Sequence, residues 1–203
     1  MDFLKEMASS ISEKVGPMLG TEQASKKLDR GAGGDISMKI DIMAENVVVQ
    51  ALEDSGANVL LISEEVGERY IGDEEKAKMT QDKIIVDPID GSNNAVRGIP
   101  FCAVSIAHAM GNSLGDIQKG VILNLITNDI FWAEKGGGAW LNEDPIHVSD
   151  NGPEDETIFE IDFDFETLIP QLRKYESIIR KIYRARVMGC NALSFCLLSK
   201  GAM

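Results

Sequence analysis

The segment 84–94, IIVDPIDGSNN, constrains the fold more than any other part of the chain. Its first three residues are apolar and β-branched, which indicates the end of a buried strand. Asp87 follows them at the carboxyl edge of that strand, where open α/β sheets present their ligand sites. Pro88 fixes φ and has no N–H, so we expect the chain to leave the sheet there in one defined direction. Asp87 and Asp90 are then a short turn apart, a spacing at which two carboxylates can hold hard divalent cations.

The second half of the segment is suited to an anion. Gly91 lets the backbone approach a ligand closely. Ser92, Asn93 and Asn94 predict a helix cap, and the first N–H groups of that helix would face a phosphate. Carboxylates for metal beside amides for phosphate indicate phosphoryl chemistry. The alternative is an ordinary polar turn, because Asp-Gly and Asn-Asn are common turn residues.

Composition narrows the class of protein. The 203 residues are 44% hydrophobic and 26% charged, as in an ordinary globular protein. The net charge of −13 argues against partners that are nucleic acids or anionic membranes. Cys102, Cys190 and Cys196 have spacings that fit neither a zinc site nor a disulfide framework, which indicates a reducing compartment. Without a signal peptide or an apolar run of membrane-spanning length, we expect a cytoplasmic protein.

A second apolar run repeats the arrangement of acids at a strand end. Residues 59–62, VLLI, predict a buried strand, and Glu64 and Glu65 follow it closely. Paired carboxylates at a strand end are commonly just solvated charge. If the two strands lie close together, however, Glu64 converges with Asp87 and Asp90.

The order of the elements predicts two layers of different kinds. The spacing of apolar runs between residues 119 and 141 is that of antiparallel hairpins, whereas the strand–helix–strand–helix order after residue 157 predicts a parallel α/β layer. The polar segment 150–156 separates them. We therefore predict an N-terminal α+β domain over residues 1–150 and the start of a C-terminal α/β domain, incomplete, over 151–203. Helices are predicted over 2–19, from about Asp41 to 52, over 168–182 and over 191–199. Further strands are predicted over 99–107, 157–163 and 184–188. We also expect a loop at 31–34 and a charged surface segment over 68–83.

The motif and its surroundings resemble a known family. Asp87-Pro-Ile-Asp-Gly-Ser, with Ser63-Glu64-Glu65 upstream and Gly98-Ile-Pro before an apolar strand, is similar to the inositol monophosphatase superfamily. That superfamily groups inositol monophosphatases, fructose-1,6-bisphosphatases and related lithium-sensitive phosphatases. Residues 131–139 and 186–192 resemble two later segments of it, and the short style of the chain resembles archaeal members with both activities. The implied fold class is α/β, a layered α+β part followed by an α/β sandwich of the sugar-phosphatase type. The later Trp-Asp motif of the family is absent, so we expect a chain that lacks the family's C-terminal part.

The resemblance implies a role for each polar residue of the motif. Glu64, Asp87, the Ile89 carbonyl and Asp90 would bind two or three Mg²⁺ ions, with Mn²⁺ as a substitute, and Asp87 would bridge two of them. Asp41 matches an acidic residue that hydrogen-bonds the hydroxyl of the motif. That hydroxyl belongs here to Ser92, where many members have threonine.

The water-activating pair would be Asp41 and Ser92, although a residue such as Asp41 near the start of a helix is often only a cap. The backbone of Gly91 and Ser92 would hold the phosphate.

The resemblance also implies a substrate. Glu64, Ile89, Asp90, Gly91 and Ser92 would contact it on the motif side. Gly189, Cys190 and Asn191 would line the alcohol or sugar, and Arg186 would contact a second phosphate. The substrate would be a small phosphorylated polyol or sugar, namely inositol monophosphate, fructose 1,6-bisphosphate or both, and a 3′-phosphonucleotide stays open. The family's habit implies a homodimer. The rival hypothesis is a non-catalytic metal- or phosphate-binding regulator that keeps the fold.

Overall fold

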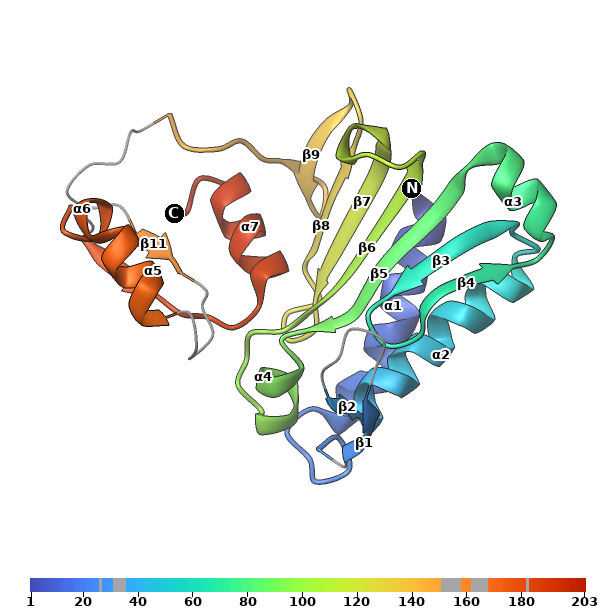
Figure 1. The fold of residues 1–203 in the computed structure, drawn as a ribbon, viewed down its shortest axis with the longest axis horizontal. Coiled ribbons are helices and arrows are strands. Elements are labelled where there is room, and N and C mark those ends of the chain that lie inside the picture. The colour runs from blue at the N-terminus through green and yellow to red at the C-terminus, as the bar shows by residue number, and fades with distance from the viewer. Residues whose placement is uncertain (26, 31–35, 151–157, 162–167, 182) are drawn as a thin grey trace.

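The computed structural model describes residues 1–25, 27–30, 36–150, 158–161, 168–181 and 183–203. Its centre is an eight-stranded mixed sheet in the order β10-β9-β8-β7-β6-β5-β3-β4 (Figure 1). Adjacent pairs are antiparallel except β3 and β5, which run parallel. The strands are β3 Val59–Ser63, β4 Gly67–Ile71, β5 Asp82–Asp90, β6 Ala103–Met110, β7 Ile117–Asn124, β8 Ile130–Glu134, β9 Gly138–Leu141 and β10 Asp144–Pro145. The hairpins predicted between residues 119 and 141 are confirmed.

Two long helices cover one face of this sheet, α1 Asp2–Val15 and α2 Lys39–Asp54 (Figure 1). The buried side chains of α1 recur at helical spacing, which gives it one apolar face toward the strands. Gly16 and Pro17 end the α-helix and start the short 3-10 helix η1 Gly16–Met18, because proline cannot donate a helical hydrogen bond. The helix predicted over 2–19 therefore ends earlier, at Val15, whereas α2 covers the whole helix predicted from about Asp41 to 52.

The pleat of β6 and β7 separates two cores. Val104 and Ile106 of β6 face α1 and α2, while Ala103 points to the opposite face. There it packs with Cys190 and Leu193, so that helix α7 Asn191–Ser199 lies on the face opposite to the two N-terminal helices. The motif on β5 therefore has the long helices on one side and the C-terminal segment on the other.

The C-terminal elements form a small parallel unit. Strand β11 Ile158–Glu160 pairs in parallel with β12 Arg184–Arg186, as the predicted α/β layer requires. The helix predicted over 168–182 is instead two short helices, α5 Leu168–Lys174 and α6 Glu176–Ile179, with a break at Tyr175. Most of the segment predicted as the domain linker, residues 151–156, lies outside the described residues, and the two-domain division stays a prediction.

Two further segments differ from the sequence prediction. The charged surface segment 68–83 contains an edge strand, β4, and the helix α3 Glu74–Thr80, capped by the Asp73 side chain. An edge strand carries exposed charged residues, and these conceal it in the sequence. A short antiparallel pair, β1 Lys27–Arg30 and β2 Ile36–Met38, precedes α2, while the loop predicted at 31–34 lies outside the described residues. None of the helices in the described part of the chain is long and apolar enough to cross a membrane.

Candidate functional site: the Asp87–Ser92 motif

Strand β5 carries the motif and does not end where the sequence predicted. It runs on past Val86 as far as Asp90. Its register against β6 shifts between Asp87, which faces Ser105, and Asp90, which faces Ala103. Three residues on β5 thus match two on β6, which is a β-bulge, and Pro88 lies inside it. The bulge takes up the residue that has no N–H to donate, so pairing resumes at Asp90 instead of stopping.

Gly91, and not a serine or asparagine side chain, forms the start of the next helix. Helix α4 Ser92–Arg97 has Gly91 as its N-cap residue, with φ of 85° and no side-chain cap bond. The predicted cap by Ser92, Asn93 or Asn94 is therefore wrong, because all three lie inside the helix. A Cβ on Gly91 would lie 2.9 Å from the Gly189 carbonyl oxygen, so glycine meets both the positive φ and the close approach.

The side chains of Asp41 and Ser92 meet although they lie 51 residues apart. The Ser92 hydroxyl lies 2.9 Å from Asp41 Oδ1 and 2.8 Å from the Ile89 carbonyl, and can donate to either. Asp41 is the third residue of α2 and is only 4% exposed. Its position inside the first turn, with its carboxylate against Ser92, favours the predicted pair over a helix cap.

The parallel pairing of β3 and β5 brings the acidic residues together. Ser63 lies opposite Val86, so Glu64 and Asp87 leave the same edge of the sheet. Burial raises the pKa of Asp87 from its ordinary 3.8 to about 7, and the negative charges of Glu64, Asp90 and, less strongly, Asp41 add to the rise. A hydrogen bond from the Ile89 N–H to Asp87 Oδ1 acts in the opposite direction. The negative charges of Glu64 and Asp90 thus act on Asp87, while the joint role of the three carboxylates as metal ligands stays a prediction.

These carboxylates are of the type that binds a hard cation, but their side chains do not form a complete set of metal ligands. Among the described residues, no three side chains of His, Cys, Asp or Glu lie close enough together to hold a metal ion as they are placed. The donors around Asp87 are nonetheless carboxylate and carbonyl oxygens, the set that Mg²⁺ prefers. A divalent cation would also relieve the repulsion that raises the pKa of Asp87. The donor chemistry therefore fits Mg²⁺, while the ligand set and the number of ions stay predictions.

The C-terminal segment closes over the motif. Asp90 Oδ2 accepts a hydrogen bond of 2.5 Å from the Ala192 N–H, in the first turn of α7, and lies 3.2 Å from Cys190 Sγ. Cys190 is buried, and both its burial and the charge of Asp90 raise the pKa of its thiol far above the ordinary range. Gly189, next to it, has φ of 73°. The structure thus brings Gly189 and Cys190 to the motif, while their contact with an alcohol or sugar stays a prediction.

The two remaining predicted residues lie at the exposed side of this segment. Asn191 is exposed at the first position of α7. Arg186 is exposed in β12, where its Nη1 donates to the Ala185 carbonyl, 3.0 Å away. Contact of Asn191 with a substrate and of Arg186 with a second phosphate stay predictions.

Two polar residues of this region escaped the sequence analysis. Asn94 lies buried beneath the turn at 188–189 and hydrogen-bonds it, whereas the sequence indicated only a cap. Glu160 Oε1 accepts from the Met188 N–H at 2.8 Å. A strand residue such as Glu160 carries no signal for this contact, because the contact depends on how β11 pairs with β12.

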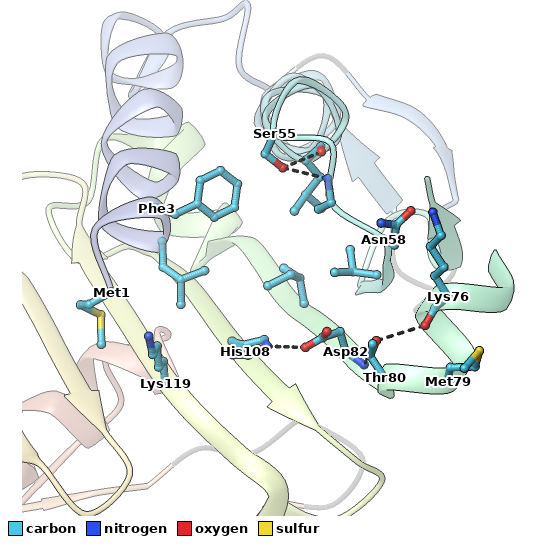
Figure 2. A pocket seen from close by; sticks show the side chains of 15 residues that line it. Met1, Phe3, Ser55, Asn58, Lys76, Met79, Thr80, Asp82, His108 and Lys119 are labelled. Carbon is cyan, nitrogen blue, oxygen red and sulfur yellow. Dashed lines mark hydrogen bonds and ion pairs between the residues drawn. The ribbon is translucent and has the colours of Figure 1, made fainter. Parts of the chain in front are cut away.

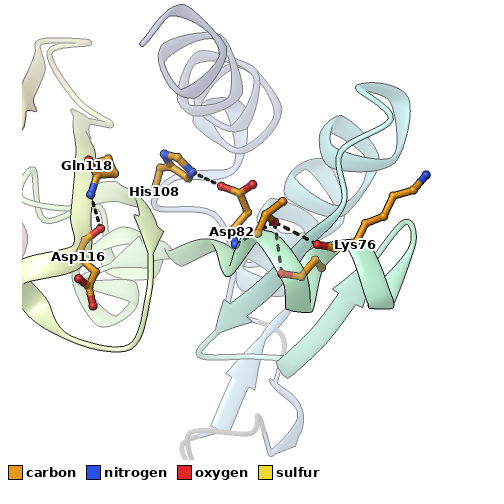
Figure 3. Close-up of polar contacts among 7 residues, drawn as sticks. Lys76, Asp82, His108, Asp116 and Gln118 are labelled. Atoms are coloured by element: carbon orange, nitrogen blue, oxygen red, sulfur yellow. Dashed lines mark hydrogen bonds and ion pairs between the residues drawn. The ribbon is translucent and has the colours of Figure 1, made fainter.

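A cavity of about 560 Å³ lies at the other end of β5. Figure 2 shows it between the start of α1, the end of α2 and α3, with Phe3 and Lys119 among its lining residues. Asp82 Oδ1 and His108 Nε2 pair there at 2.9 Å (Figure 3). Because Asp82 begins β5 and Asp87 lies near its end, this cavity is separate from the motif.

Comparison with known proteins identifies the family. The sequence profile of the inositol monophosphatase family matches residues 1–203. The chain belongs to this family. A curated member from Methanothermobacter thermautotrophicus, named fructose-1,6-bisphosphatase/inositol-1-monophosphatase, is 36% identical over 97% of this chain and 70% of its own length. The family and the fold class predicted from the motif are therefore confirmed, and the family is one of phosphatases.

Other relatives show how the same sequence region is used in longer proteins. A bifunctional NADP phosphatase/NAD kinase from Methanococcus maripaludis is 31% identical over 100% of this chain, which spans only 38% of that protein. Among solved structures, the extragenic suppressor protein suhB from Bartonella henselae superposes with a TM-score of 0.84 at 28% identity, covering 99% of this chain and 74% of that one. An inositol monophosphatase–fructose 1,6-bisphosphatase gives a TM-score of 0.80 at 27% identity, covering 100% of this chain and 73% of that one.

Proposed function

We propose that this inositol monophosphatase family member is a Mg²⁺-dependent phosphomonoesterase that hydrolyses a small phosphorylated polyol or sugar. Inositol monophosphate and fructose 1,6-bisphosphate are the candidate substrates. The observation that carries the proposal is the hydrogen bond from Ser92 Oγ to Asp41 Oδ1, next to the carboxylate cluster around Asp87. A hydroxyl held by a buried carboxylate, beside oxygen ligands for a cation, is an arrangement that can activate water for attack on a phosphate ester.

Residues of the chain would transfer a proton from the attacking water and hold the phosphate in position. When Asp41 accepts the Ser92 proton, the Ser92 oxygen is free to accept a proton from a water molecule. The water then loses that proton to Ser92 as Ser92 gives its own to Asp41, which leaves a hydroxide and a protonated Asp41. The backbone of Gly91 and Ser92 would hold the phosphate, where N–H groups at the start of α4 are not used by the helix itself.

The metal site would be built from Glu64, Asp87, Asp90 and the Ile89 carbonyl. Bound Mg²⁺ supplies the positive charge that acidifies water, neutralises the phosphoryl oxygens and stabilises the leaving alkoxide. Asp87, with its raised pKa, holds a proton more readily than an ordinary carboxylate, so metal and proton compete for it. Gly189, Cys190 and Asn191 would line the alcohol or sugar, and Arg186 a second phosphate.

Phosphate release tests the proposal. Inositol 1-phosphate, fructose 1,6-bisphosphate and NADP should each be offered with Mg²⁺ and with a chelator; NADP is included because of the name of the Methanococcus maripaludis relative. We expect Mg²⁺-dependent release from at least one of the first two. Asp41→Asn should lower kcat by about a hundredfold or more, the usual scale for a general base. The matched control is Asp54→Asn, an exposed aspartate at the end of the same helix, which should leave kcat unchanged.

A non-catalytic regulator is the second candidate. The observation that favours it is that, within the described residues, the acidic side chains are not gathered into a ready metal site, which metal-assisted hydrolysis needs and phosphate binding by backbone N–H groups does not. Such a protein would bind Mg²⁺ or phosphate and release no phosphate from any of these esters, and Asp41→Asn would then have no activity to lower.

We further propose a cytoplasmic homodimer, for which a solution molecular mass near twice 22.2 kDa is the expected result.

A further inference from the structure

Asn94 joins the motif helix to the C-terminal segment. Its side chain is 9% exposed, on the buried side of α4. Its Nδ2 lies 2.8 Å from the Phe101 carbonyl and 2.8 Å from the Met188 carbonyl, with the Gly189 carbonyl at 3.4 Å. One side chain of the motif thus contacts a turn 94 residues further along the chain.

The two N–H donors of the Asn94 amide match the two carbonyl acceptors that lie next to it. A side-chain NH₂ has two hydrogens, and the two short contacts are both with carbonyl oxygens, which only accept. The reversed amide would turn an oxygen toward two carbonyls and leave all three without a donor. On its other side, the turn is held by Glu160, which accepts from the Met188 N–H at 2.8 Å. Both polar groups of the Met188 residue are therefore fixed by side chains.

The turn approaches the motif closely at two glycines. A Cβ on Gly91 would lie 2.9 Å from the Gly189 carbonyl oxygen, and a Cβ on Gly189 would lie 3.3 Å from Asn94 Nδ2. The turn also leads directly into Cys190 and α7, where the Ala192 N–H donates to Asp90. A shift of the turn would therefore displace residues 189–191 relative to Asp87 and Asp90.

We propose that Asn94 is the positioning residue that holds the turn at 188–191 in place over the motif. The part of this inference that concerns substrate binding rests on the function proposed above, whereas the part that concerns the turn does not. The Asn94 side chain donates to backbone carbonyls of residues 101, 188 and 189, so its role is to place other residues.

The key variant is Asn94→Asp, which keeps the size of the side chain and replaces its donor by an acceptor. Two carbonyls would then face a carboxylate, and the turn should open. Asn94→Ala removes the donor without adding a charge, and serves if the first variant fails to fold. The matched control is Asn93→Asp, which makes the same change at the neighbouring position of the same helix, where the side chain is exposed and accepts from Arg97.

Thiol labelling of the native chain measures how often the turn opens, and it does not require enzymatic activity. Cys190 is buried beneath the turn, whereas Cys102 is buried in the core between the sheet and the long helices. We expect iodoacetamide to label Cys190 at least about tenfold faster in both Asn94 variants than in wild type, the effect of ~1.4 kcal/mol on local opening. Labelling of Cys102 should rise less than that of Cys190, because Asn94 also contacts the carbonyl of the neighbouring Phe101. Asn93→Asp should behave as wild type.

Two results would overturn the proposal. Equal Cys190 rates in wild type and both Asn94 variants would show that the turn does not depend on Asn94. A loss in the free energy of urea unfolding large enough to account for the whole rise in Cys190 labelling would show that Asn94 stabilises the whole fold and not this turn.

Kinetics supply a second, separate readout. If the chain hydrolyses its substrate, the Asn94 variants should raise KM by about tenfold and leave the Mg²⁺ concentration for half-maximal activity unchanged. A fall in kcat with unchanged KM would contradict the positioning of substrate-lining residues. If wild type shows no activity, the proposed function fails, and the labelling result still decides whether Asn94 holds the turn.

Discussion

The buried charge of Asp87 has a consequence for stability that can be measured without any substrate. Burial and the neighbouring acids raise the pKa of Asp87 from 3.8 to about 7, so the folded metal-free protein binds a proton there more tightly than the unfolded chain does. Stability therefore falls as pH rises from about 4 through about 7, because the folded state must give up that proton. At 1.36 kcal/mol per pKa unit, the full effect above pH 7 is at most about 4 kcal/mol.

Asp87→Asn removes this charge and keeps the oxygen that accepts from the Ile89 N–H. We expect the metal-free variant to be more stable than wild type by about 1–3 kcal/mol at about pH 8, and equal to it near pH 4. Mg²⁺ should cancel or reverse this difference at pH 8, since a ligand that binds only the folded state stabilises it by about 2.7 kcal/mol at a hundred times its Kd. The variant should lose this gain.

Urea unfolding, followed with chelator and with saturating Mg²⁺, measures these differences. The matched control is Asp82→Asn, at the other end of the same strand, where the carboxylate pairs with His108. That variant should not gain stability when metal-free and should keep the full effect of Mg²⁺. If Asp87→Asn is destabilised without metal, or if Mg²⁺ stabilises it as much as wild type, the metal-site account of Asp87 is wrong.

Three further predictions concern the same site. Gly91→Ala should lower the free energy of unfolding by about 1–3 kcal/mol more than Gly136→Ala, because both glycines have positive φ but a Cβ at Gly136 meets open space. Equal losses in urea unfolding would contradict the close approach of Gly91 to Gly189. Ser92→Thr should keep phosphatase activity and Ser92→Ala should lower kcat by about a hundredfold, so equal activities for the two variants would remove the hydroxyl from the mechanism. Calorimetric titration should show that Mg²⁺ and Mn²⁺ bind and that zinc is not preferred. The reason is that the raised pKa of Cys190 keeps the thiol beside Asp90 protonated, so that oxygen atoms are the available ligands. Tighter binding of zinc would show that the thiol takes part.

The sequence was sufficient for those parts of the site that depend on neighbours in the chain or on parallel strands. Apolar β-branched runs located β3 and β5, and because the carboxyl ends of parallel strands meet at one edge, Glu64 and Asp87 could be expected to converge. The pairing of Asp41 with Ser92 came from the resemblance to the family, since nothing in their spacing predicts it. The structure gives that pairing its geometry.

Other features depend on tertiary packing and left no signal of their own. The sequence placed the end of β5 before Pro88, because a proline usually interrupts a ladder, whereas pairing with β6 carries the strand through a bulge. Asn94 looked like a capping residue, yet its partners are carbonyls supplied by residues 101 and 188. Charged residues concealed β4, which exists because the edge of β3 was available for pairing.

A double-mutant cycle on Asp41 and Ser92 tests the proposed mechanism most directly. The measurement is kcat for Mg²⁺-dependent phosphate release by wild type, Asp41→Asn, Ser92→Ala and the double variant. If the two side chains act as one water-activating pair through their 2.9 Å hydrogen bond, each single variant should lose about a hundredfold and the double variant should lose no more than the worse single one. Losses that multiply in the double variant would contradict the account, because the two residues would then act independently.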